Sequence, residues 1–276
     1  MMSGEMNDIR IKEVIRNIWT FTLRMGYKFI PYRLPPPIVE EDWDWLVVLD
    51  ACRYDDFKEV NFIEGELKPY ISRGSATPEW FRNNFYEEHK DIVYYNANPV
   101  VAREIKKSGF NPFYKIFHIW KYGWNDEFNT VLPRTVNMVV LETKDNFRDK
   151  RKIIHYIQPH CPFLSLPIKR DETFKDVFED FTIIDRTRRM LFFYGNGVWK
   201  KLRTGEIDNC KGRNAYRKNI EIVLKRVQEL ISHLDGKIVI TADHGNLFGE
   251  YFIYAHPVGL RIKKLVEVPW LEVKNE

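Results

Sequence analysis

The chain of 276 residues has 44% hydrophobic, 30% charged and 15% aromatic residues, which supports a sizeable buried core and excludes intrinsic disorder. Its net charge of +4 falls short of a nucleic-acid-binding surface, and no uncharged apolar run reaches the about 18 residues of a membrane-spanning helix. The cysteines Cys52, Cys161 and Cys210 are too few and too far apart for a disulfide scaffold, which favours a cytoplasmic location.

The first 37 residues differ from the rest of the chain and are predicted to form a separate segment. Apolar residues at helical spacing share one face, with basic residues around them: Ile11, Ile15, Ile18, Trp19 and Leu23. Such a helix packs back on the core or on a partner, which we favour, or makes a peripheral contact with an anionic membrane. The prolines at 35–37 form an extended linker, so residues 38–276 are predicted to be a single domain.

Beyond the linker, buried strands alternate with helices. Three short apolar runs predict strands, at 45–49, 153–157 and 238–240. The spacing of apolar residues predicts a long helix over 215–234. This alternation predicts a three-layer α/β/α sandwich around a mostly parallel central sheet. The aromatic-rich segment 98–151 is predicted to pack in the core without a chemical role.

The three apolar runs all end in polar residues. Asp50 ends the first, His160 follows the second, and Asp243 and His244 follow the third. In a parallel sheet these carboxyl ends lie along one edge, where ligands bind. Asp and His are suitable ligands for a divalent cation, although a helix N-cap alone would explain either aspartate. Their occurrence together favours a metal site.

Thr77 is the candidate nucleophile. Residues 74–81 predict a tight loop entering a helix, with Thr77 at the N-cap and Pro78 at the first helical position. A hydroxyl there faces the positive end of the helix, a favourable place for phosphate, and contact with a metal would activate it. A plain capping role for Thr77 is the alternative, and Ser75 is the rival nucleophile.

Three segments together resemble the alkaline phosphatase superfamily, and within it the sulfatase-like branch. They are the strand ending in Asp50-Ala51-Cys52-Arg53, the Pro159-His160-Cys161-Pro162-Phe163 segment, and Asp243-His244-Gly245 followed by Gly249-Glu250. The resemblance implies that one divalent ion (zinc, manganese, magnesium or calcium) is bound by Asp50, Thr77, Asp243 and His244, with a second ion left open. It further implies that Thr77 is the nucleophile, with His160 beside the transferred group.

Two further residues have roles that the resemblance leaves open. It implies that His256 binds the substrate anion or serves as an extra metal ligand. Arg53 contacts phosphate or forms an ion pair with Asp55 or Asp56.

The expected activity is that of a metal-dependent phosphoric-ester hydrolase or phosphotransferase. None of the cysteines lies in the Cys-x-Pro/Ala-x-Arg motif of sulfatases, and a threonine nucleophile resembles the phosphodiesterase and phosphoethanolamine-transferase branches. The alternatives are a sulfuric-ester hydrolase and a non-catalytic metal- or anion-binding module. The expected location is cytoplasmic, with membrane association through residues 1–37 left open. The sequence leaves the substrate, the metal and the oligomeric state undetermined.

Overall fold

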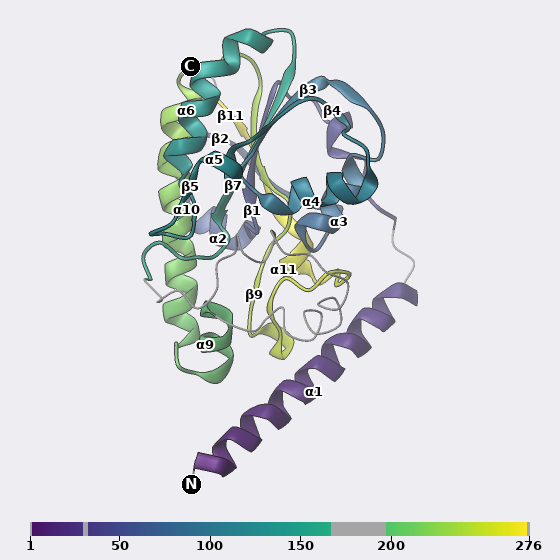
Figure 1. Ribbon diagram of the computed structural model, residues 1–276, viewed down its shortest axis with the longest axis vertical. Coiled ribbons are helices and arrows are strands. Elements are labelled where there is room, and N and C mark those ends of the chain that lie inside the picture. The colour runs from purple at the N-terminus through teal and green to yellow at the C-terminus, as the bar shows by residue number, and fades with distance from the viewer. Residues whose placement is uncertain (1, 30–32, 167–196, 275–276) are drawn as a thin grey trace.

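A seven-stranded sheet forms the centre of the computed structural model, which describes residues 2–29, 33–166 and 197–274 (Figure 1). The strand order is β2-β11-β8-β1-β7-β3-β4. The bounds are β1 Trp45–Asp50, β2 Gly65–Ile71, β3 His89–Asn96, β4 Phe113–His118, β7 Arg151–Pro159, β8 Ile238–Ala242 and β11 Glu267–Val273. Neighbouring strands from β8 to β4 are parallel, whereas β11 is antiparallel to both β2 and β8. The mostly parallel sheet predicted from the sequence is confirmed.

Helices cover both faces of this sheet (Figure 1). On one face lie α2 Tyr54–Val60, α6 Pro133–Thr143 and α10 Asn209–Ile231, and on the other lie α3 Thr77–Asn84 and α4 Pro99–Ser108. The central strand β1 serves both layers because successive side chains of a strand point to opposite faces. Val47 and Leu49 pack with α10, while Leu46 and Val48 pack with the aromatic residues of α3. Burial of both faces confirms the three-layer α/β/α sandwich.

Shorter elements connect these layers. The helical ones are η1 Ile38–Glu40, α5 Ile119–Tyr122, η2 Lys144–Phe147, α9 Val198–Thr204, η3 Glu250–Phe252 and α11 Lys263–Val266. The short strands are β5 Trp124–Asn125, β6 Thr130–Val131, β9 Leu247–Phe248 and β10 Tyr254–Ala255.

The predicted strands and the long helix are all present, with differences in their limits. The three apolar runs lie within β1, β7 and β8. Helix α10 begins at Asn209 instead of Ala215, because Asp208 caps it by accepting hydrogen bonds from the backbone N–H groups of Cys210 and Lys211, at 2.8 and 3.3 Å. This cap lies before the periodic apolar residues from which the start was predicted.

Helix α1, Met2–Phe29, lies outside the sandwich (Figure 1). Trp19 Nε1 donates a hydrogen bond to the Tyr251 carbonyl at 3.0 Å, and Leu23 and Tyr27 pack on the apolar cluster that follows β8. Among the helices that the structure describes, none is long and apolar enough to cross a membrane. The division into residues 1–37 and a single domain stays a prediction, and 30–32 and 167–196 lie outside the described residues.

Candidate active site

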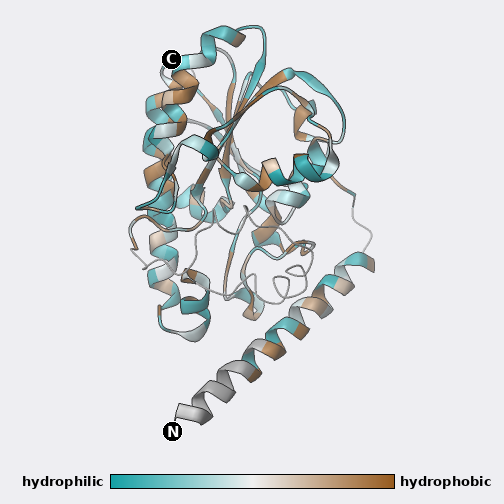
Figure 2. Ribbon diagram, in the orientation of Figure 1, coloured by the Kyte–Doolittle hydropathy of each residue, from teal (hydrophilic) through white to brown (hydrophobic). Residues whose placement is uncertain are grey.

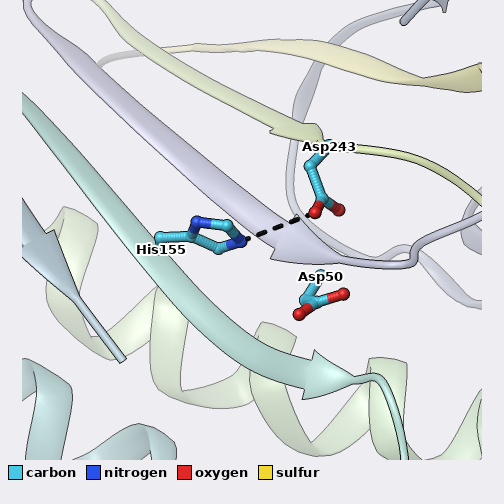
Figure 3. A group of neighbouring side chains, drawn as sticks. All are labelled: Asp50, His155 and Asp243. Atoms are coloured by element: carbon cyan, nitrogen blue, oxygen red, sulfur yellow. Dashed lines mark ion pairs between the residues drawn. The ribbon is translucent and has the colours of Figure 1, made fainter. Parts of the chain in front are cut away.

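Polar side chains meet at the carboxyl ends of three neighbouring strands, β8, β1 and β7. Asp50 is the last residue of β1, Asp243 directly follows β8, and His160 directly follows β7. Each of these three residues is at most 8% exposed. Figure 3 shows Asp50 and Asp243 close together on neighbouring strands, with His155 of β7 beside them. The structure thus brings together the strand ends singled out in the sequence.

Thr77 reaches this cluster from the first turn of α3. Its Oγ1 donates a hydrogen bond to Asp243 Oδ2 at 2.7 Å and lies 3.4 Å from His244 Nε2. The prediction that Thr77 is the N-cap is wrong by one residue, because the N-cap is Ala76 and the helix begins at Thr77. The threonine hydroxyl is therefore directed at the acidic cluster instead of capping its own helix.

His244 presents one ring nitrogen to three oxygens. We assign the ring proton to Nδ1, which lies 2.8 Å from the Gly245 carbonyl, so that Nε2 carries a lone pair. This Nε2 lies 3.4 Å from Asp243 Oδ2, 3.4 Å from Thr77 Oγ1 and 3.6 Å from Asp50 Oδ1. Such distances are long for hydrogen bonds but close to the separation of about 3.3 Å between two ligands of a tetrahedral zinc ion. Burial lowers the pKa of His244, which favours the neutral, metal-binding form.

Asp50 is a buried carboxylate that lacks a full set of partners. Burial, and then the charge of Asp243, raise the pKa of Asp50 well above its usual value. Asn98 Nδ2 donates to Asp50 Oδ2 at 2.5 Å, whereas Oδ1 has no hydrogen-bond partner among the described residues. Burying two carboxylates together is costly unless a cation offsets their charge. The donor set therefore fits a divalent cation.

His155 is a second candidate imidazole ligand, to which the sequence prediction assigned no role. Ligand atoms of Asp50, His155 and Asp243 lie within 4.8 Å of one another (Figure 3). His155 Nδ1 is 2.8 Å from the Tyr94 hydroxyl, and Nε2 has no hydrogen-bond partner among the described residues. Burial lowers the pKa of His155 to about 4, so the ring is neutral. Its signal in the sequence was a lone imidazole inside an otherwise apolar buried strand.

His160 and His256 extend the cluster on the side of His244. The ring centroid of His256 lies 4.4 Å from that of His244 and 5.0 Å from that of His160. Burial and the two neighbouring imidazoles lower the pKa of His256 well below its usual value. Burial alone would lower the pKa of His160, but the neighbouring Cys161 and Asp50 outweigh burial and raise this pKa to about 10. Both residues are thus placed beside the donor set, and their catalytic and binding roles stay predictions.

Asn98 also lies at the site, although no chemistry was assigned to the segment 98–151. Its Oδ1 accepts a hydrogen bond from the Val100 backbone N–H at 2.8 Å and so caps α4. Its Nδ2 bonds Asp50 and lies 3.4 Å from Thr77 Oγ1. In the sequence, an asparagine before a proline predicts only a helix cap. Because Oδ1 forms this cap, the amide nitrogen Nδ2 faces the cluster.

Ser75, the rival nucleophile, is engaged elsewhere. Its Oγ lies 2.9 Å from Glu79 Oε2 and 3.0 Å from the Pro257 carbonyl, and it accepts a hydrogen bond from the Gly259 N–H at 2.9 Å. These contacts tie the loop before α3 to the segment after His256. The geometry therefore favours Thr77 over Ser75 as the nucleophile.

Arg53 is buried in an ion-pair network. Its guanidinium is 1% exposed and lies 2.8 Å from Asp55, 3.2 Å from Asp56 and 2.6 Å from Glu250. Three carboxylates therefore surround the charge that would have to bind a substrate phosphate. This arrangement is the ion-pair alternative that the sequence left open, and it favours a structural role.

Arg53→Gln is expected to lower the free energy of unfolding by about 1–3 kcal/mol, because it removes a buried charged donor, while Arg213, Arg217 and Lys264 still pair with Asp55 and Asp56. Arg226→Gln is the matched control, since Arg226 pairs with Glu229 at the surface with side chains 46% and 58% exposed, and it should cost at most about 1 kcal/mol. Urea unfolding measures both variants. A raised KM with unchanged stability in Arg53→Gln would instead assign this residue to substrate binding.

The same network predicts the pH range of that loss. Burial raises the pKa of Asp55, but hydrogen bonds and attraction to Arg53 and Lys264 outweigh it and leave the pKa well below its usual value. A depressed pKa in the folded state stabilises the protein above the unfolded value of about 3.9, and this contribution is lost as the pH falls below it. The difference between the wild type and Arg53→Gln should therefore shrink below about pH 4.

Comparisons with known proteins bear on the fold. No family model and no curated protein matches the chain. The soluble domain of lipooligosaccharide phosphoethanolamine transferase A from Neisseria meningitidis matches with a TM-score of 0.53 and 14% identity, over 83% of this chain and 75% of that one. The C-terminal periplasmic domain of phosphoethanolamine transferase EptC from Campylobacter jejuni has a TM-score of 0.51 and 15% identity, over 82% and 77%. A candidate sulfatase from Bacteroides thetaiotaomicron has a TM-score of 0.50 and 9% identity, over 84% and 64%.

The fold is that of the alkaline phosphatase superfamily. The resemblance carried by the three sequence segments is confirmed at this level. At these identities the comparison extends to the alkaline-phosphatase-like fold and no further.

The prediction of a cytoplasmic location is wrong. Among the proteins with the same alkaline-phosphatase-like fold, the Campylobacter jejuni domain is periplasmic, which points away from the cytoplasm. The prediction came from cysteine usage, and the three cysteines are indeed unpaired in the structure. Unpaired cysteines show that disulfides do not hold the fold together, but they do not identify a compartment.

Proposed function

We propose that the chain is a metal-dependent enzyme that transfers a phosphoryl or substituted phosphoryl group from an ester to water or an alcohol, with Thr77 as the nucleophile. The observation that carries this proposal is the position of Thr77 Oγ1, 2.7 Å from Asp243 Oδ2 and 3.4 Å from His244 Nε2. The alkaline-phosphatase-like fold, which phosphoethanolamine transferases share, supports this reaction class.

Asp50, Thr77, Asp243 and His244 would hold the ion. A bound divalent cation would lower the pKa of the threonine hydroxyl and offset the negative charge of the phosphate. Three oxygen donors and one imidazole suit zinc or manganese, and magnesium and calcium stay within the proposal. His155 competes with His244 for this role because it faces the same two carboxylates.

Thr77 acts first. Its Oγ1 forms a bond to phosphorus as the bond to the leaving oxygen breaks, giving a phosphothreonine and an alkoxide that takes a proton from water and leaves as an alcohol. In the structure the Thr77 hydroxyl donates to Asp243 Oδ2. This oxygen would serve as the metal ligand, because Oδ1 accepts hydrogen bonds from the backbone N–H groups of Ala51 and His244, so the hydroxyl proton would pass to water. Water or an acceptor alcohol then attacks phosphorus in turn, and Thr77 Oγ1 leaves and regains a proton.

Three side chains around Thr77 would bind or stabilise the transferred group. The amide of Asn98 has two N–H groups, one bonded to Asp50, so the other can donate to a phosphate oxygen beside Thr77. His160, directly after the strand next to β1, would face the transferred group or its leaving oxygen. His256, whose ring lies tilted against that of His244, would contact the anion.

Release of 4-nitrophenol tests the reaction class. We expect the purified chain to hydrolyse 4-nitrophenyl phosphate or bis(4-nitrophenyl) phosphate when one of zinc, manganese, magnesium or calcium is supplied, and to lose this activity in EDTA. An added acceptor alcohol distinguishes transfer from hydrolysis, because a transferase would yield a new ester of that alcohol, a phosphomonoester from the first substrate and a phosphodiester from the second. Turnover in EDTA equal to that with metal would contradict the proposal.

Measurements on the same purified chain also distinguish two alternative functions. Turnover of 4-nitrophenyl sulfate in preference to both phosphates would favour a sulfuric-ester hydrolase, which the fold shared with a candidate sulfatase keeps in view. A bound metal, measured by elemental analysis, without turnover of any ester would favour a non-catalytic binding module.

A further inference from the structure

The apolar face of helix α1 is broad, and the domain covers only part of it. At one edge of this face Trp19, Leu23 and Tyr27, four positions apart, contact the segment after β8, although Trp19 remains 42% exposed. The rest of the face contains apolar residues three and four positions apart that are 56–61% exposed: Ile11, Val14, Ile15, Ile18 and Phe21. A helix that only needed to dock on the domain would carry polar residues on its outer face.

An exposed aromatic pair lies next to this helix. Tyr251 and Phe252 in η3 are 59% and 78% exposed, and both have a positive φ, at 55° and 60°. Non-glycine residues rarely adopt this conformation, and it is least favourable for bulky side chains. The Trp19 indole bonds the Tyr251 carbonyl, so the aromatic pair and the helix form one surface. We call α1 residues 11–29 together with Tyr251 and Phe252 the α1 surface.

The charge of the α1 surface indicates what covers it. Residues 11–29 contain four basic residues and one acidic residue, a net charge of +3, whereas the whole chain of 276 residues carries +4. A second copy of the chain would bring two such positive segments together, which like-charge repulsion opposes. An anionic lipid surface attracts them, and Trp, Tyr and Phe favour the boundary between headgroups and acyl chains.

We infer that the α1 surface docks on an anionic lipid bilayer, with α1 lying in the plane of the interface. Figure 2 shows that α1 lies apart from the sandwich and that the coloured part of the helix combines hydrophobic and hydrophilic residues, as an interfacial helix does. The inference does not depend on catalysis, because it rests on exposure and charge alone.

Co-sedimentation of the full chain with vesicles tests this inference. We expect the chain to pellet with vesicles of phosphatidylcholine and phosphatidylglycerol (3:1) and to remain largely in the supernatant with phosphatidylcholine alone. Ile15→Ser combined with Ile18→Ser should lower partitioning at least about tenfold, because two apolar side chains are lost from the interface. These side chains are about 60% exposed, so the variant should keep the thermal unfolding temperature of the wild type.

The matched control is Met138→Ser with Leu141→Ser, on helix α6, where exposed apolar residues lie away from α1. It should bind vesicles as the wild type does. Equal loss in both variants, equal binding to both lipid mixtures, or no binding to either would overturn the inference. A dimer by size-exclusion chromatography that Ile15→Ser with Ile18→Ser abolishes would assign the surface to a second copy instead.

Discussion

Thr77→Ala is expected to lower the turnover of phosphate esters at least about 1,000-fold while the fold is retained. The reason is that the covalent step needs an oxygen at this position, which lies 2.7 Å from Asp243 Oδ2 in the donor set. Thr77 is only 4% exposed, and its side-chain contacts are with Asp243 and His244 after β8 and with Asn98 at the N-cap of α4. The rival hydroxyl of Ser75 cannot easily replace it, because it is bonded to Glu79 and to residue 257.

Two variants make this test specific. Thr77→Ser keeps the hydroxyl and should retain turnover within about tenfold of the wild type. Ser75→Ala removes the rival hydroxyl and should leave turnover within about tenfold, while the loss of its hydrogen bonds lowers the free energy of unfolding by about 1–3 kcal/mol. Steady-state kinetics and urea unfolding give the two readouts. An active Thr77→Ala together with an inactive Ser75→Ala would move the nucleophile to Ser75.

Asp243→Asn is expected to weaken zinc binding at least about 100-fold, since it removes a charged ligand from the donor set. In the wild type, a zinc concentration of 100 times Kd should raise the free energy of unfolding by about 2.7 kcal/mol. The variant at that concentration should gain almost nothing. Calorimetric titration of the metal-free protein measures the affinity, and urea unfolding with and without zinc measures the stabilisation.

Asp42→Asn controls for a loss of negative charge without loss of a ligand. Asp42 is 90% exposed and pairs with Lys237 at the surface, so this variant should bind zinc as the wild type does. Equal zinc affinity in the wild type and Asp243→Asn would place the ion elsewhere.

Much of the fold and part of the site could be predicted because both depend on the central strands. The strands β1, β7 and β8 are buried on both faces, and such strands appear as unbroken apolar runs. Polar residues at their ends therefore stood out, and the parallel arrangement brought Asp50, His160 and Asp243 to one edge.

The residues that were missed lack this kind of signal. His155 lies inside β7, and a buried histidine in a strand usually has only a packing role. Asn98 caps α4, and only the fold shows that its amide reaches Asp50. The exposed part of the apolar face of α1 could not be distinguished from the covered part, because the helical spacing does not indicate which part the domain covers.

The position of the metal ion is the central claim, and anomalous X-ray diffraction at the zinc absorption edge, from crystals grown with zinc, tests it most directly. We predict one strong peak within about 2.0–2.2 Å of His244 Nε2 and of oxygens from Asp50, Asp243 and Thr77. A peak bonded to His155 and the two carboxylates but distant from His244 and Thr77 would contradict the assignment. So would the absence of any peak at the ends of β1 and β8.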